Sequence, residues 1–253
     1  MQDKLTPRQS RAWGLCALSV PAAMVLAGRG WLWVLAGSAA ASGIVLFLQT
    51  LQRRNGQSLP EQMARALGRR GGRVLGAAVC LWLLLAASGA AAASQIAFED
   101  DLGPLAPAVP LLLAALASRK GQAAAARGSG VLALCLALLY SIIALASLRH
   151  VQAAWCRPWG SAADAGLSLC LCLTPAGLLF LDGDGQTPRP GWSALAAAVL
   201  PGAAALLCSA CLSPAWTAQL PQPLYTLTKS LSVLSVMQRF ELLLSTAQLL
   251  GLV

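Results

Sequence analysis

The sequence WLWVLAGSAAASGIVLFLQTLQRR, residues 31–54, sets a pattern that the rest of the chain repeats. Its first 22 residues carry no charge, and a helix of about 20 such residues crosses the hydrocarbon core of a membrane. Trp31 and Trp33 stand at its start, where aromatic rings suit the membrane interface. Arg53 and Arg54 follow its end. The segment therefore predicts a membrane-spanning helix over residues 31–51 that ends at a basic surface.

The composition of the whole chain agrees with this segment. Of the 253 residues, 57% are hydrophobic and only 11% are charged, whereas soluble domains carry about 25% charged residues. Alanine- and leucine-rich tracts alternate with short basic or proline- and glycine-rich connections. In lipid, every backbone polar group must be satisfied inside the helix itself. We therefore expect an all-α, polytopic integral membrane bundle that forms one domain over residues 1–253.

The apolar tracts predict about eight membrane spans. Ser58-x-x-Glu61, with Pro60 between its ends, is typical of a helix start, and it predicts an amphipathic cytoplasmic segment over residues 58–70. The spans are expected at residues 12–28, 31–51, 74–98, 105–117, 129–148, 165–181, 192–212 and 233–253.

The cationic residues are distributed unequally between the two sides of such a bundle. The chain has 18 lysines and arginines and a net charge of +9. If the spans alternate, thirteen of them lie on one side and only Arg29, Arg149 and Arg157 lie on the other, while Lys229 and Arg239 belong to the final segment. This bias places the N-terminus in the cytoplasm, and eight spans return the C-terminus there. The basic residues do not interleave with aromatic residues, so we expect no nucleic-acid partner.

No motif of an enzyme is present in the sequence. The patterns H-E-x-x-H, G-x-S-x-G and G-x-x-x-x-G-K-[ST] are all missing. Cys208-x-x-Cys211 has the spacing of a metal or redox pair, but it has no second pair and the only histidine is His150. We therefore expect no catalytic residue, no metal site, no cofactor and no disulfide.

Proline interrupts the first and the sixth predicted spans. Pro21 lies within the first span, and Thr174-Pro175 lies within the sixth. In a fold of two five-helix halves these are corresponding positions, and such interruptions point to a transporter-type binding site. Freed backbone groups and small hydroxyls make Ser19, Pro21, Thr174 and Pro175 the candidate ligand-binding residues. The alternative interpretation is that proline is simply common in membrane helices.

Four segments of the chain resemble one known family. They are LTPRQ at 5–9, the second span with its arginine-rich exit at 30–68, SRKGQAAAARGSGVL at 118–132, and the final segment 223–253 with Arg239-x-Glu241. In order and spacing they are similar to the B subunit of endospore germinant receptors. These spore germination permeases are related to the amino acid–polyamine–organocation transporters. The resemblance implies structural roles for Lys120, Gly121, Arg127, Arg239 and Glu241.

The resemblance also implies a fold and a function. The fold is expected to be a truncated form of the five-plus-five inverted-repeat transporter, because the family has ten spans and this chain would end in its eighth. The function is expected to be the sensing of a small germinant, such as an amino acid, in the cell membrane or spore inner membrane. The partners would be membrane lipid and A- and C-type receptor subunits.

Two other functions remain open at this point. One is an amino-acid permease that carries out transport, and the other is a non-catalytic membrane scaffold. The charged residues of the final segment do not distinguish between these functions. Arg239 and Glu241 are two residues apart and point about 200° away from each other on a helix, so they do not pair directly. We expect them to anchor the last span against the bundle.

Overall fold

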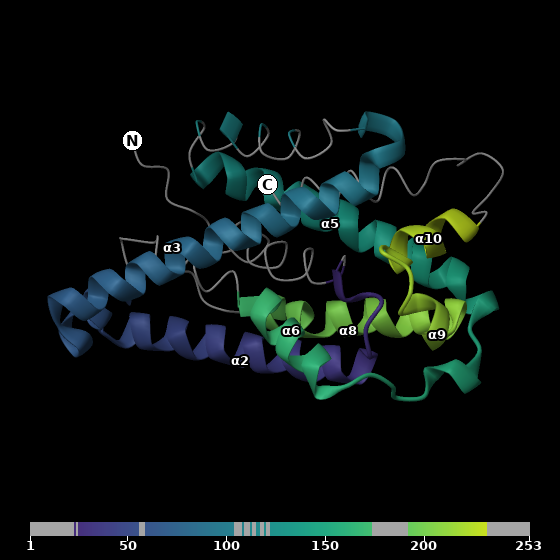
Figure 1. Ribbon diagram of the computed structural model, residues 1–253, viewed down its shortest axis with the longest axis horizontal. Helices are drawn as coiled ribbons and strands as arrows, with labels where there is room; N and C mark the ends of the chain where they lie inside the picture. The colour runs from purple at the N-terminus through teal and green to yellow at the C-terminus, as the bar shows by residue number, and fades with distance from the viewer. Residues whose placement is uncertain are drawn as a thin grey trace.

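The computed structural model describes residues 23, 25–55, 59–103, 108, 112, 115–116, 119, 122–173 and 192–231. Helix is the only regular secondary structure in this part of the chain (Figure 1). The elements are α2 (Trp31–Asn55), α3 (Leu59–Leu102), α5 (Gln122–Ser147), α6 (Ala162–Leu173), α8 (Trp192–Leu212), α9 (Pro214–Thr217) and α10 (Pro223–Ser230), with the short 3₁₀ helices η2 (Leu148–His150) and η3 (Ala153–Cys156) between α5 and α6.

Within the described residues, three segments are long and apolar enough to cross a membrane: Trp31–Gln52, Arg70–Gly89 and Gly128–His150. The apolar part of α6 and the Ala198–Leu212 part of α8 are shorter. The prediction of an all-α chain with membrane-type helices is therefore confirmed for the described residues. The number of eight spans and the inverted-repeat arrangement stay predictions.

Helix α2 runs side by side with α6, and the two helices point in the same direction. Their close approach depends on Gly37, because a Cβ atom at that position would overlap the carbonyl oxygen of Ala165 and lie 2.8 Å from Ser168 Cβ. The Ser168 hydroxyl donates a hydrogen bond to the Val34 carbonyl oxygen at 2.8 Å. Small residues and interhelical hydrogen bonds of this kind hold helices together where lipid offers no hydrophobic driving force.

Helix α8 packs against α2 in the opposite direction. A Cβ atom at Gly202 would lie 2.9 Å from Leu35 Cβ, so the two backbones are close here as well. The Ser38 hydroxyl donates a hydrogen bond to the Ala198 carbonyl oxygen at 2.5 Å. Because α6 is parallel and α8 antiparallel to α2, the three helices have the relative directions that alternating spans 2, 6 and 7 require.

A second apolar core joins α5, α8 and α10. The α5 residues recur at the three- and four-residue spacing of one helix face. The Cys211 thiol of α8 lies 3.8 Å from the Ser147 carbonyl oxygen at the end of α5. The core consists of Ala27, Leu136, Leu139, Ile143, Cys208, Leu212, Leu224, Leu227 and Leu231.

Helix α3 differs from the others because no described element packs extensively along it. Its Arg70–Gly89 part has no buried residue among those whose burial is described. Large apolar side chains such as Leu81, Leu84 and Leu85 are exposed there. In water such a surface would be unfavourable, but in a bilayer the lipid tails cover it.

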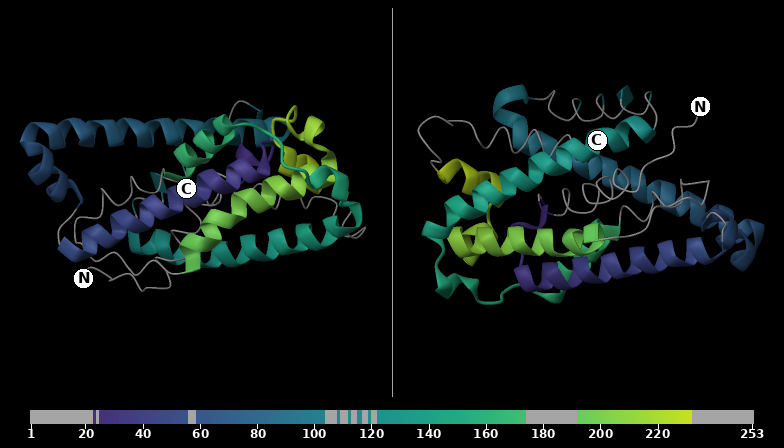
Figure 2. Two further views of the ribbon diagram at one scale, coloured as in Figure 1. Left: turned by 90° about the horizontal axis from the view of Figure 1, so that it is seen from below. Right: turned by 180° about the vertical axis from the view of Figure 1, so that it is seen from behind.

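The segments predicted at 58–70 and 74–98 lie in one element, α3, which runs from Leu59 to Leu102. This element turns sharply at Gly68, whose φ of 74° is one that glycine adopts without steric cost. The turn is visible in Figure 2.

Candidate functional site

The inward side of α2 carries a row of polar residues, which we call the α2 polar face. It consists of Ser38, Ser42, Gln49 and Gln52, with Val45 in the middle of the row. Successive members are four, three, four and three residues apart, so at about 100° per residue they fall within one arc of about 80°. Ser38 and Gln52 are 0% exposed and Ser42 is 5% exposed. A polar row is therefore buried inside an apolar bundle.

Most polar atoms of this face have no partner in the protein. Ser38 donates its hydrogen bond to α8, but Ser42 Oγ, Gln49 Oε1 and both amide atoms of Gln52 are buried without any hydrogen bond. Leaving one such group unpaired costs about 1–3 kcal/mol. Buried polar groups in proteins are nearly always paired with protein or water. The unpaired atoms therefore mark a place for a bound polar molecule or for water.

The chemistry of the α2 polar face is hydrogen bonding without charge. Each glutamine amide offers two donors and one acceptor oxygen, and each serine hydroxyl offers one donor and two lone pairs. Among the described residues, Asp164 is the only buried charged side chain, and it lies at the start of α6, near the other end of α2. Within this part of the chain the face can hold and orient a polar molecule, but it contains no pair of acid and base groups.

The α2 polar face contacts the end of α6. Val45 packs with Leu48 and Leu173, and Leu173 is the last residue of α6. Ser42 and Gln49 lie about one turn to either side of Val45 on α2. The polar face therefore lies next to the last turn of α6.

The residues predicted from the sequence as a binding site are not placed by the structure. Arg127 lies in α5, but its side chain is outside the described part of the structure. The others also lie outside the described residues: Ser19, Pro21, Lys120, Gly121, Thr174, Pro175, Arg239 and Glu241.

The α2 polar face is missed by reasoning from proline interruptions and charges, because its members are neutral and lie in an uninterrupted helix. The 4-3-4-3 spacing of serine and glutamine within an apolar tract is a signal that could have found it.

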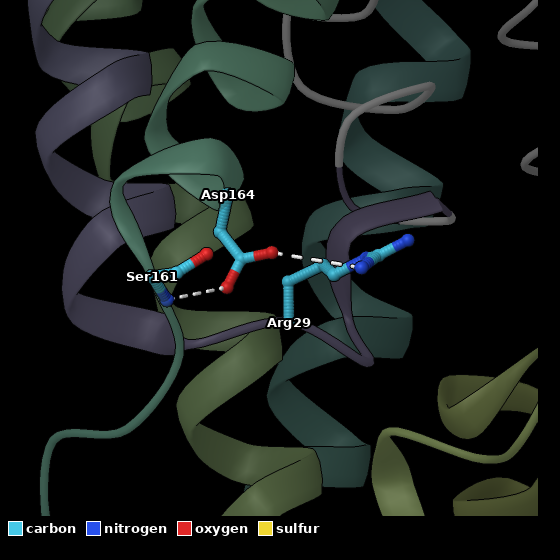
Figure 3. A network of polar contacts seen from close by, with 3 residues as sticks. All are labelled: Arg29, Ser161 and Asp164. Atoms are coloured by element: carbon cyan, nitrogen blue, oxygen red, sulfur yellow. Dashed lines mark hydrogen bonds and ion pairs between the residues drawn. The ribbon is translucent and has the colours of Figure 1, made fainter.

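A second polar cluster fixes the start of α2 to the start of α6 (Figure 3). The Arg29 guanidinium lies 3.6 Å from Asp164 Oδ1, and the Ser161 backbone N–H donates to Asp164 Oδ2 at 3.1 Å. Ser161-x-x-Asp164 is therefore one half of a capping box, in which a carboxylate accepts from the backbone at the N-cap. The negative charge also suits the positive end of the α6 dipole. The role of this cluster is structural.

Replacing Asp164 by alanine is expected to lower the free energy of unfolding by about 1–2 kcal/mol, the usual cost of losing a helix cap. Thermal unfolding of the purified protein in detergent measures the change. The matched control is Arg29→Ala, which removes only the ion pair. The Arg29 side chain is 54% exposed, so this variant should cost less than about 1 kcal/mol. Equal losses in the two variants would contradict the capping role of Asp164.

The described residues do not form a metal centre. They contain no group of three or more histidine, cysteine, aspartate or glutamate side chains that could hold a metal ion. Cys208 and Cys211 are both free thiols, so they do not form a disulfide with each other in this structure. Comparison of the chain with protein-family models, with curated proteins and with solved structures finds no match.

Proposed function

We propose that this chain is a permease-like subunit of a membrane-protein complex. It binds a small polar molecule inside its helix bundle, along the α2 polar face. One observation carries the proposal: Gln52 is fully buried and both of its amide atoms are unpaired. It lies at the end of a segment that is long and apolar enough to cross a membrane. Polar groups on the inner side of membrane helices mark binding sites and solute pathways by default.

The energetic cost of Gln52 supports a functional role. An apolar side chain of similar volume would fill the same space without two unpaired groups, which together cost about 2–6 kcal/mol. A ligand that accepts from the amide N–H and donates to the amide oxygen recovers this energy on binding. The unpaired groups therefore contribute to affinity, because they have no protein partner that a ligand must displace.

The framework around the α2 polar face supports binding by a preformed site. The Ser168 hydroxyl of α6 and the Ser38 hydroxyl of α2 tie α2 to its two neighbours. Gly37 and Gly202 bring the backbones of these helices into contact. A site on helices held this closely has little side-chain and backbone freedom left to lose when a ligand binds.

The resemblance of four segments to spore germination permeases supports an amino acid as the bound molecule. On this proposal the chain is a germinant-receptor subunit of the spore inner membrane with its N-terminus in the cytoplasm. Its partners are A- and C-type subunits. Binding favours one arrangement of the helices, and the shift between arrangements is limited by the difference in the ligand's affinity for them.

The proposal is tested with purified full-length protein and a panel of amino acids. A ligand at 100 times its Kd stabilises a protein by about 2.7 kcal/mol, which corresponds to a rise in Tm of about 5–10 °C for a chain of this size. We expect such a rise with a small group of polar amino acids. If no amino acid raises the Tm and none binds in an equilibrium assay with radiolabel, the proposed function is wrong and a scaffold role gains support.

A second assay separates sensing from transport. The protein is reconstituted in vesicles, and uptake of the amino acid that binds is followed under an ion gradient. A sensor is expected to bind the ligand without accumulating it, at the level of protein-free vesicles. Sustained accumulation above that level would identify a permease instead.

A further inference from the structure

The first third of α3 contains a sharp turn, which we call the α3 bend and define as residues 64–73. Gly68 has a φ of 74°, a left-handed conformation that glycine adopts without steric cost. A Cβ atom at Gly72 would lie 3.0 Å from Ala64 Cα and 3.1 Å from Ala64 Cβ. In a straight helix, residues eight positions apart are separated by about 12 Å. The first arm of α3 is therefore folded onto the second, and Figure 2 shows the short arm turning into the long one.

The α3 bend carries exposed arginines on both of its arms. Arg65 follows Ala64 on the first arm, and Arg73 follows Gly72 on the second. Since consecutive Cα atoms are about 3.8 Å apart, the contact between Ala64 and Gly72 places the Cα atoms of Arg65 and Arg73 within about 12 Å of each other. Arg65, Arg70 and Arg73 are all exposed. Their long side chains can therefore reach a common ligand.

The positive charge of the α3 bend is not neutralised within the described residues. None of its exposed arginines takes part in an ion pair there. Guanidinium groups gathered in this way repel one another unless an anion lies between them. The planar fork of arginine matches the oxygens of phosphate. The chemistry of the cluster therefore favours a phosphate-bearing ligand.

Exposed apolar side chains flank these arginines. Leu67 is 59% exposed and Val74 is 72% exposed. The second arm then continues into Arg70–Gly89, which is apolar enough to cross a membrane. Arginines that can bind a lipid headgroup therefore lie next to an apolar surface that can contact acyl chains. A free phosphate would make no contact with the apolar side chains. Single-stranded nucleic acid is usually bound by aromatic rings, and residues 64–73 contain none.

We propose that the α3 bend is a binding site for the headgroup of an anionic phospholipid. The lipid phosphate lies between the guanidinium groups of Arg65 and Arg73, and its acyl chains lie along the apolar start of the second arm. The turn at Gly68 shapes the site, because it sets the two arms against each other at Ala64 and Gly72, the residues that precede Arg65 and Arg73. This proposal does not depend on the function of the α2 polar face.

The test compares two short-chain lipids with identical acyl chains, one with a phosphatidylglycerol and one with a phosphatidylcholine headgroup. Each is titrated into the full-length protein in a neutral detergent, and binding is measured by native mass spectrometry. The wild type is expected to prefer phosphatidylglycerol. Each basic residue near an anionic lipid contributes about fivefold to binding, so the variant R65Q/R73Q should lose about thirtyfold in affinity for phosphatidylglycerol.

The matched control removes the same charge elsewhere. Arg149 and Arg157 are exposed residues of the segment between α5 and α6, which lies at the opposite end of α2 from the α3 bend (Figure 1), and R149Q/R157Q should retain the preference for phosphatidylglycerol. Gly68→Ala keeps every charge and disturbs only the turn, so it should weaken binding of phosphatidylglycerol. Wild-type affinity in R65Q/R73Q or in Gly68→Ala, or an equal loss in the control, would overturn the proposal. So would full competition by inorganic phosphate, which would show an anion site without lipid selectivity.

Discussion

Replacing Gly37 by leucine is expected to lower the free energy of unfolding by about 3 kcal/mol, the upper end of the usual cost of overpacking. A Cβ atom at this position would already overlap the Ala165 carbonyl oxygen, and backbone atoms cannot rotate away as side chains can. The α2 and α6 helices must therefore separate, and the hydrogen bond from Ser168 to Val34 would lengthen or break. Thermal unfolding in detergent should show a fall in Tm of about 6–12 °C.

The control for this variant lies on the same helix. Gly43 has no atom within 4 Å of the place where its Cβ would stand, and it is exposed. Gly43→Leu introduces the same side chain and the same gain in helix propensity, about 1 kcal/mol, so its Tm should not fall. A similar fall in both variants would mean that leucine harms α2 for a reason other than contact with α6.

Replacing Gln52 by leucine is expected to have two opposite effects. Removing two unpaired buried atoms should raise the free energy of unfolding by about 2–6 kcal/mol. The same change removes the hydrogen-bonding groups that the proposed ligand uses, so the affinity for the amino acid should fall by at least about tenfold, the equivalent of about 1.4 kcal/mol. Tm without ligand and Kd by equilibrium binding measure the two effects on the same preparation.

Thr50→Val is the matched control for Gln52→Leu. Thr50 is exposed on α2, and its hydroxyl donates to the Leu46 carbonyl oxygen within the same helix. Valine removes that hydroxyl without changing the volume of the side chain, and neither binding nor stability should change by much. A Gln52→Leu protein could instead be more stable and still bind the amino acid with wild-type affinity. This result would mean that the Gln52 amide contacts buried water, and it would contradict a ligand at the α2 polar face.

The helices of this chain are largely readable from local sequence. The 22 uncharged residues that begin at Trp31 and the basic residues that follow them predict α2 closely, because hydropathy and chain length alone decide whether a helix can cross lipid. The arginine- and glycine-rich residues 68–73 look like a break between two helices. The chain does turn there, at Gly68, although both arms belong to the one element Leu59–Leu102.

The candidate site was predictable only in part. Proline interruptions at Pro21 and Pro175 are visible in the sequence, and the structure does not describe them. The polar residues of α2 are equally visible, but serine and glutamine on a membrane helix can face a neighbouring helix, lipid headgroups or a ligand. Which of these applies depends on the packing around α2. A pattern within a single helix does not contain that information.

The sequence by itself determined that this chain forms apolar helices with most of its positive charge on the connections, because both properties follow from local composition. Only the tertiary structure decided that Gln52 is buried without a partner and that Ala64 meets Gly72 across the α3 bend. The bond between Ser168 and Val34 joins residues 134 positions apart, and such contacts choose the side of α2 that faces inward. They depend on backbone approach at single glycines, which composition and periodicity do not reveal.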